Sequence, residues 1–251
     1  MSPLTPDQPV RRTVVKHQIP SARLASGERS VRLYLPPDYR DDVAYPVVYC
    51  QDGEDFFNFG RVATIAHERI AGGVWEPFVI VGVDVDKKVR TEEYQPGSER
   101  HEAYLSFWME ELVPYVESRY SVRRDPTGRL LAGDSLGGAV SLSIALRHPE
   151  AFTRILSLSG AYYDASIRQI QQAADLSHLA LWMIVGLQET AYQTDHGTFN
   201  FVELNRMARR LLERKGAYID YREKNGEHKW GFWQTELPEA LGAFLGPEAH
   251  M

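Results

Sequence analysis

The chain has 251 residues, of which 43% are hydrophobic and 25% are charged. This length and composition fit one α/β domain with a buried core and exclude a disordered chain. Because 28 Lys and Arg stand against 34 Asp and Glu, the net charge is -6, which disfavours binding to nucleic acid or to an anionic membrane. A lone cysteine, Cys50, cannot form an internal disulfide or a zinc site built from cysteines.

The start of the chain carries neither the charged nor the apolar region of a signal peptide, and no apolar run is long enough to cross a membrane. We therefore expect a cytoplasmic protein that makes no contact with a membrane. Residues 1–9 are rich in proline and are expected to form a flexible tail. Residues 10–251 show no internal repeat and no linker, so we expect them to form a single catalytic domain.

The hydrophobic pattern predicts a mostly parallel sheet. Residues 10–19 and 30–35 alternate apolar and polar side chains, which predicts an antiparallel strand pair joined by a turn at 25–28. Later strand segments lack this alternation, as is typical of parallel strands covered on both faces. In chain order we expect strands at 45–50, 78–85, 128–132, 155–159, 179–185 and 218–222. Helices are expected at 58–71, over about five turns from residue 104, from residue 136, and at 166–174, 199–215 and 231–244, with a long polar loop at 86–100. This alternation predicts an α/β fold with a sheet of about eight strands and helices on both faces.

A G-x-S-x-G motif stands between a predicted strand and a predicted helix, at residues 133–137. In this position the motif is typical of a nucleophile elbow, a sharp turn at which flanking side chains would collide, so that glycine is needed on both sides of Ser135. The first amides of the new helix, beginning with that of Leu136, point to the same space and can stabilise an oxyanion. The alternative is a glycine-rich turn with a solvated serine.

A serine nucleophile needs a base, and His228 lies in the turn between the last strand and the last helix. In this fold the chain order is nucleophile, acid, base, so the acid is expected after the strand at 179–185. Two residues of that loop qualify, Glu189 and Asp195. Glu189 is nearer to the rigid strand end and is preferred, but chain order alone does not exclude Asp195.

A second oxyanion donor is expected in the loop after the strand at 45–50. Gly53 lets this backbone bend, so that the next amide, that of Glu54, can face Ser135, while Asp52 can brace the turn. Without Ser135, the same residues would be interpreted as a generic acidic turn.

Several segments resemble, in order and spacing, the "Putative esterase" family of α/β-hydrolases, which includes the catalytic domain of enterochelin esterase and single-domain relatives that cleave siderophore trilactones. The segments are residues 51–56 (Q-D-G-E-D-F), 83–94, 132–138 (A-G-D-S-L-G-G), 157–162 (S-L-S-G-A-Y), 185–190 (V-G-L-Q-E-T) and 226–233 (G-E-H-K-W-G-F-W). The resemblance implies an α/β-hydrolase fold, with Ser135, His228 and Glu189 as the triad and the Glu54 and Leu136 amides as oxyanion donors. It also implies substrate-binding roles for Arg90, Tyr162, Tyr163 and Trp230. For Arg90 the alternative is that it is a solvated residue of a polar loop.

The expected activity is the hydrolysis of a carboxylic ester through an acyl-serine intermediate, with a siderophore trilactone or a small ester as the substrate. An acyltransferase would use the same residues, and a binding protein on a hydrolase fold is a further alternative. We expect no metal and no organic cofactor, because the sequence has no H-E-x-x-H, no Walker motif and no G-x-G-x-x-G after a strand. The oligomeric state and the acyl and alcohol groups stay open.

Overall fold

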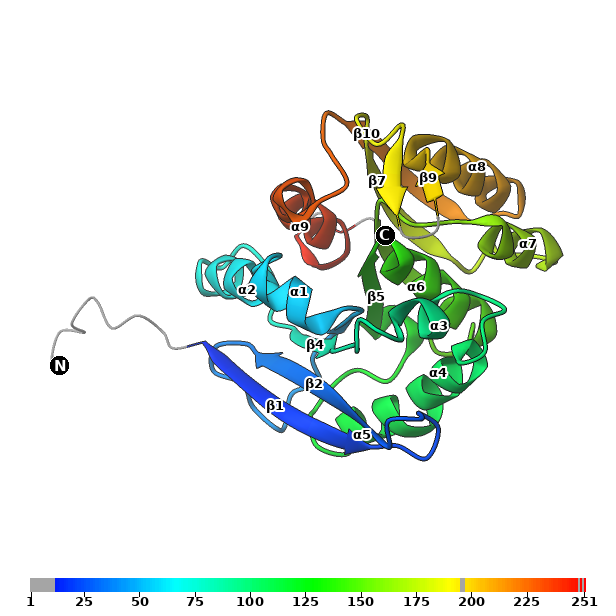
Figure 1. The fold of residues 1–251 in the computed structure, drawn as a ribbon. Helices are drawn as coiled ribbons and strands as arrows, with labels where there is room; N and C mark the ends of the chain where they lie inside the picture. Colours follow the sequence, from blue (N-terminus) through cyan, green and yellow to red (C-terminus); the bar gives the residue numbers. More distant parts are fainter. Residues whose placement is uncertain (1–11, 195–196, 248, 250) are drawn as a thin grey trace, which may run out of the picture.

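The computed structural model describes residues 12–194, 197–247, 249 and 251, so the tail expected at 1–9 lies outside the described residues. An eight-stranded sheet runs through the centre of the molecule in the order β1-β2-β4-β3-β5-β6-β7-β10 (Figure 1). The strands are β1 (Thr13–Pro20), β2 (Glu28–Leu35), β3 (Val47–Cys50), β4 (Val79–Val83), β5 (Arg129–Asp134), β6 (Arg154–Leu158), β7 (Ala180–Gly186) and β10 (Tyr218–Lys224). Strands β1 and β2 pair antiparallel with each other, and β2 pairs antiparallel with β4. Every other neighbouring pair is parallel, which confirms the predicted α/β architecture.

Helices cover both faces of the sheet and bury one apolar cluster on each (Figure 1). The first face carries α1 (Gly53–Asn58), α2 (Val62–Ala71) and α9 (Trp230–Leu245). The second face carries α4 (His101–Phe107), α5 (Val113–Glu117), α6 (Leu136–Arg147), α7 (Asp164–Gln172) and α8 (Phe201–Arg214). Because the central strands are apolar on both sides, as parallel strands require, only their ends are left for polar chemistry. None of the helices among the described residues is both long and apolar enough to span a membrane.

Four predicted segments differ from the structure. The helix expected at 58–71 begins only at Val62, as α2, because Arg61 before it has a left-handed φ of 52°, and the separate helix α1 ends at Asn58. The loop expected at 86–100 contains the short helix α3 (Arg90–Tyr94). The predicted five-turn helix is continuous from α4 to α5 but has a π-helical segment at Trp108–Leu112, just before Pro114, which has no N–H to donate.

A small hairpin accounts for the fourth difference. Strands β8 (Tyr192–Thr194) and β9 (Gly197–Phe199) pair antiparallel, so α8 begins at Phe201 rather than at residue 199. Strands of three residues are too short to show a recognisable alternation, and the sequence pattern therefore missed them.

Candidate active site

The backbone turns sharply at Ser135, as the G-x-S-x-G motif predicts. Ser135 lies between β5 and α6 with φ 53° and ψ -122°, a conformation that costs a residue other than glycine about 1–3 kcal/mol. Its N–H donates to Leu158 O over 2.9 Å, which holds the turn against β6. A Cβ atom on Gly133 would lie 2.2 Å from the backbone of Gly137, and one on Gly138 would lie 2.6 Å from Ser157 Oγ. Glycine is therefore required at Gly133 by a close backbone contact and at Gly138 by a close contact with a buried side chain.

The structure brings Ser135, His228 and Glu189 together from three loops at the carboxyl ends of β5, β10 and β7. His228 Nε2 lies 3.0 Å from Ser135 Oγ, and His228 Nδ1 lies 2.7 Å from Glu189 Oε2. With the proton on Nδ1, the imidazole donates to the carboxylate and accepts from the serine hydroxyl. This is the geometry of a general base that is oriented by an acid.

The second oxygen of Glu189 is also fully engaged. Oε1 accepts hydrogen bonds from the Gly186 N–H over 2.8 Å and from Ser159 Oγ over 2.7 Å, and the residue is 1% exposed. Trp233 Nε1 in turn donates to Ser159 Oγ over 2.9 Å. Sequence reasoning assigned no role to Ser159 or Trp233, although both lie in the segments that carry the family resemblance. The rival acid, Asp195, lies outside the described residues.

Aromatic rings surround the imidazole of His228. The ring centroids of Phe201 and Tyr192 lie 4.0 and 4.4 Å from it, and Trp233 meets it edge-on at 4.9 Å. These rings keep water from the hydrogen bond between His228 and Glu189, which strengthens that bond. Beside the triad lies a cavity of about 490 Å³, lined by Gln188, Glu189, Ala191, Tyr192, Glu227, His228 and Lys229.

The turn between β3 and α1 lies directly against the nucleophile elbow. A Cβ atom on Gly137 would be 3.1 Å from Gln51 Cβ and 3.2 Å from Asp52 Oδ2, so the two loops touch. Within the described residues, no hydrogen-bond acceptor is found for the N–H of Leu136 or of Glu54. These are the two amides that the sequence predicts as oxyanion donors.

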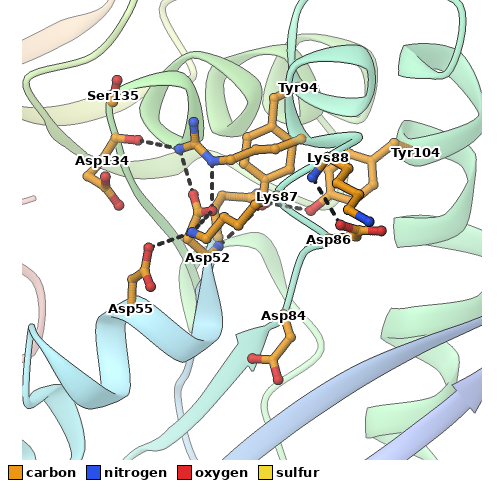
Figure 2. A network of polar contacts seen from close by, with 12 residues as sticks. Asp52, Asp55, Asp84, Asp86, Lys87, Lys88, Tyr94, Tyr104, Asp134 and Ser135 are labelled. Carbon is orange, nitrogen blue, oxygen red and sulfur yellow. Dashed lines mark hydrogen bonds and ion pairs between the residues drawn. The ribbon is translucent and has the colours of Figure 1, made fainter. Parts of the chain in front are cut away.

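Arg90 is bound to a buried carboxylate. Its Nε and Nη2 each donate to one oxygen of Asp52 over 2.7 Å, and Nη2 also lies 3.4 Å from Asp134 O. Figure 2 shows Asp52 and Asp134 near each other, with Ser135 next to Asp134. Asp52 is 1% exposed and the Arg90 side chain 18% exposed, so the alternative of a solvated loop residue is wrong. Asp52 takes up both of these donor groups, and a contact of Arg90 with a substrate stays a prediction.

Two buried carboxyl groups next to the serine have opposite pKa shifts. Burial alone would raise the pKa of Asp52, but the charges of Arg90 and Lys87 outweigh it and hold this pKa below its ordinary value. Burial, together with the nearby charge of Asp52, raises the pKa of Asp134 to about 7. Among the described residues, Asp134 Oδ1 has no hydrogen-bond partner, so no hydrogen bond at this oxygen offsets its loss of water.

The three aromatic residues that were predicted to contact a substrate lie in three different environments. The prediction that Tyr162 contacts a substrate is wrong, because this side chain is fully buried in the core and its hydroxyl donates to Ser157 Oγ over 2.7 Å. Tyr163 is half-buried, with Phe199 at 4.5 Å, and lines a cavity of about 390 Å³ together with Gln95, Asp164, Ala165, Arg168, Phe199 and Leu204. Trp230 packs edge-on against Phe56 at 4.8 Å, between α1 and α9, and its contact with a substrate stays a prediction.

Among the residues that the structure describes, no three His, Cys, Asp or Glu side chains are grouped so that they could hold a metal.

The chain matches a known protein family and a relative from Bacillus subtilis (strain 168). The model of the family described as "Putative esterase" matches residues 21–244. The Bacillus subtilis (strain 168) protein named "Uncharacterized protein YjcH" is 34% identical over 221 residues, which cover 87% of this chain and 92% of that protein.

Solved structures share the fold at lower identity. A ferulic acid esterase has a TM-score of 0.78 at 20% identity, and the match covers 93% of this chain and 98% of that chain. The enterobactin esterase FES from Shigella flexneri has a TM-score of 0.78 at 19% identity, and the match covers 92% of this chain but 59% of that chain. The chain therefore has the α/β-hydrolase fold and belongs to the "Putative esterase" family, which supports an enzyme that acts on esters.

Proposed function

We propose that this protein hydrolyses carboxylic esters through a covalent acyl-Ser135 intermediate. The observation that carries the proposal is the continuous set of hydrogen bonds from Ser135 through His228 to Glu189. Ser135 Oγ attacks the ester carbonyl carbon while His228 Nε2 takes the serine proton. The same nitrogen gives this proton to the leaving alcohol and then activates a water molecule, which releases the acid and restores Ser135.

The amides of Leu136 and Glu54 are proposed to donate to the oxyanion of the tetrahedral intermediate. Both N–H groups are without an acceptor in the described residues, and their loops touch at Gly137 and Asp52. Each such donor typically contributes about 10²- to 10³-fold to kcat, because it stabilises charge that develops only in the transition state.

For the substrate we propose a small ester with an aromatic group, or a siderophore trilactone. The cavity next to Tyr163 and Phe199 offers flat apolar surface, on which a ring can stack. Two of the similar structures are named for ferulic acid and for enterobactin, which is consistent with this choice.

The proposal is tested by labelling and turnover on one preparation. The wild-type protein should react with a fluorophosphonate and hydrolyse short p-nitrophenyl esters, an alkyl ferulate or a siderophore trilactone, and Ser135→Ala should do neither. Product analysis with an added alcohol distinguishes hydrolysis from acyl transfer, because an acyltransferase would yield a new ester. A wild-type protein that is neither labelled nor active on any of these esters would contradict the proposal and favour a binding protein.

A further inference from the structure

Asp52 stands directly before helix α1, and its side chain does not do what an aspartate in that position usually does. An aspartate before a helix normally has extended backbone angles and accepts a hydrogen bond from the second or third N–H of the helix. Here the backbone of Asp52 has the left-handed conformation, with φ 48° and ψ 51°, and its carboxylate accepts no hydrogen bond from the helix. Both of its oxygens bind Arg90 instead.

The amide that this carboxylate would otherwise reach is that of Glu54. The third N–H of the helix, on Asp55, already donates to Asp52 O over 2.9 Å, whereas the second, on Glu54, has no acceptor in the described part of the chain. A carboxylate of Asp52 released from its partner would relax to the usual backbone angles and bind the Glu54 N–H. That amide would then no longer be free for an oxyanion at Ser135.

We propose that Arg90 is a positioning residue that keeps the Glu54 amide free by holding both carboxylate oxygens of Asp52 away from it. The inference rests on the proposed function, because it assigns a role to the oxyanion donor of that same site. The contact of Arg90 Nη2 with Asp134 O joins the Asp52 turn to the residue before the nucleophile. One guanidinium therefore fixes the two loops that are to surround the oxyanion.

Lys87 does not provide the same control. Its Nζ lies 3.4 Å from Asp52 Oδ1 and 2.5 Å from Asp55 Oδ2, and its side chain is 57% exposed. An ammonium that reaches one oxygen at long distance cannot restrain a carboxylate as a planar guanidinium with two parallel hydrogen bonds does. Arg90 is also restrained by the ring of Tyr94, whose centroid lies 5.0 Å from the guanidinium carbon.

The first test is Arg90→Ala, measured on an ester that the wild type hydrolyses. We expect kcat to fall about 100-fold, as when one oxyanion donor is lost, while KM changes less than about threefold. Affinity for a trifluoromethyl ketone, which forms an oxyanion on the serine, should fall by about the same factor as kcat.

The sharper test is the double variant Asp52→Ala with Arg90→Ala. Without the carboxylate nothing occupies the Glu54 N–H, so the double variant should be at least about tenfold faster than Arg90→Ala alone. Removing both charges also avoids leaving a buried unpaired carboxylate, so the double variant should fold at least as well as the single one. If the double variant is as slow as Arg90→Ala, the inference is overturned.

Arg129→Ala is the matched control for loss of a buried arginine. Arg129 lies at the opposite end of β5, where it pairs with Glu117, donates to Ala151 O and contacts the ring of Phe152. Arg129→Ala should lower the melting temperature as Arg90→Ala does, but its kcat should stay within about threefold of the wild-type value. If the two variants lose kcat equally, Arg90 contributes only to stability and the inference fails.

If Arg90→Ala does not fold, Arg90→Lys tests the same inference, because a lysine can bind only one oxygen of Asp52 at a time. We expect a smaller loss of kcat, about 10-fold, again with KM nearly constant, and an unchanged kcat would overturn the inference. Failure of this inference is distinct from failure of the proposed function. In the first case the wild type is labelled and active and Arg90 variants keep their kcat, whereas in the second the wild type itself shows neither labelling nor turnover.

Discussion

Ser159 donates its hydroxyl hydrogen to Oε1 of Glu189 over 2.7 Å, while the other carboxylate oxygen faces His228. The serine is itself held, because Trp233 donates to its oxygen and its own backbone is left-handed, with φ 47°. A carboxylate with both oxygens bound cannot rotate away from the imidazole. Four side chains, from Trp233 through Ser159 and Glu189 to His228, are thus connected behind the nucleophile.

From this relationship we predict that Ser159→Ala lowers kcat about 10-fold with little change in KM. A hydrogen bond to a charged group contributes about 1.5–3 kcal/mol, and only part of this is expressed in the transition state. Steady-state kinetics on one ester measures the effect. Ser157→Ala is a suitable control, because this buried hydroxyl binds Tyr162 and not the triad, and equal losses in the two variants would contradict the assignment.

Replacing Ser135 by alanine should cut kcat by roughly 10⁴- to 10⁶-fold and abolish labelling by an organophosphate, because nucleophile and base act as one unit. The fold should be retained, since alanine removes one oxygen atom and no packing. Mass spectrometry of the labelled protein and a thermal unfolding curve check both points. Turnover above about a tenth of the wild-type value would show that Ser135 is not the nucleophile.

The acid is tested by comparing Glu189→Gln with Asp195→Asn. We expect Glu189→Gln to lower kcat about 10²- to 10⁴-fold, because a glutamine cannot stabilise the imidazolium that forms when His228 takes the proton. Asp195→Asn should cost less than about tenfold. The reverse order would give the role to Asp195, and two mild losses would indicate a dyad of Ser135 and His228.

The buried carboxyl of Asp134 should make stability depend on pH. Its pKa in the folded protein, about 7, is above that of an unfolded aspartate, about 3.9, so the folded state holds its proton more tightly. Its contribution to the free energy of unfolding is therefore complete below about pH 4 and is lost as the pH rises to about 7. The pKa of Asp52 is shifted in the opposite direction, below its ordinary value. Its contribution to the free energy of unfolding is therefore complete at neutral pH and is lost only as the pH falls through this lowered pKa.

Asp134→Asn removes this titration without changing the shape of the side chain. Relative to the wild type, the variant should gain about 2–4 kcal/mol in the free energy of unfolding between pH 4 and pH 8. Urea denaturation at several pH values measures this difference, in which the titration of all other groups cancels. A difference that does not vary with pH would mean that Asp134 is ionised throughout this range.

The sequence predicted those features that depend on local pattern. The apolar runs gave the parallel strands, and the glycines around Ser135 indicated the elbow because close backbone contacts exclude other residues there. His228 and Glu189 could be chosen because chain order in this fold limits the acid and the base to single loops. These inferences need no knowledge of where a side chain points.

Features that depend on side-chain direction were not predictable. Arg90 lies in a polar loop whose composition fits a solvated segment equally well, and its partner, Asp52, is far from it in the sequence. Tyr162 and Tyr163 are neighbours of the same type, and only the packing against Gly160 and Ser157 decides that the first is buried. The support of Glu189 by Ser159 was missed for the same reason.

The hairpin of β8 and β9 has a consequence for how this site can diverge. It lies in the chain between Glu189 and α8, and it supplies Tyr192 beside His228 and Phe199 beside Tyr163. The carboxylate of Glu189 is held by groups outside the hairpin, namely the Gly186 N–H at the end of β7 and the Ser159 hydroxyl after β6. Substitutions of Phe199 can therefore reshape the cavity beside Tyr163 without disturbing the acid, whereas Tyr192 contacts the imidazole. We therefore expect the preferred ester to change among relatives through Phe199 while the chemistry stays the same.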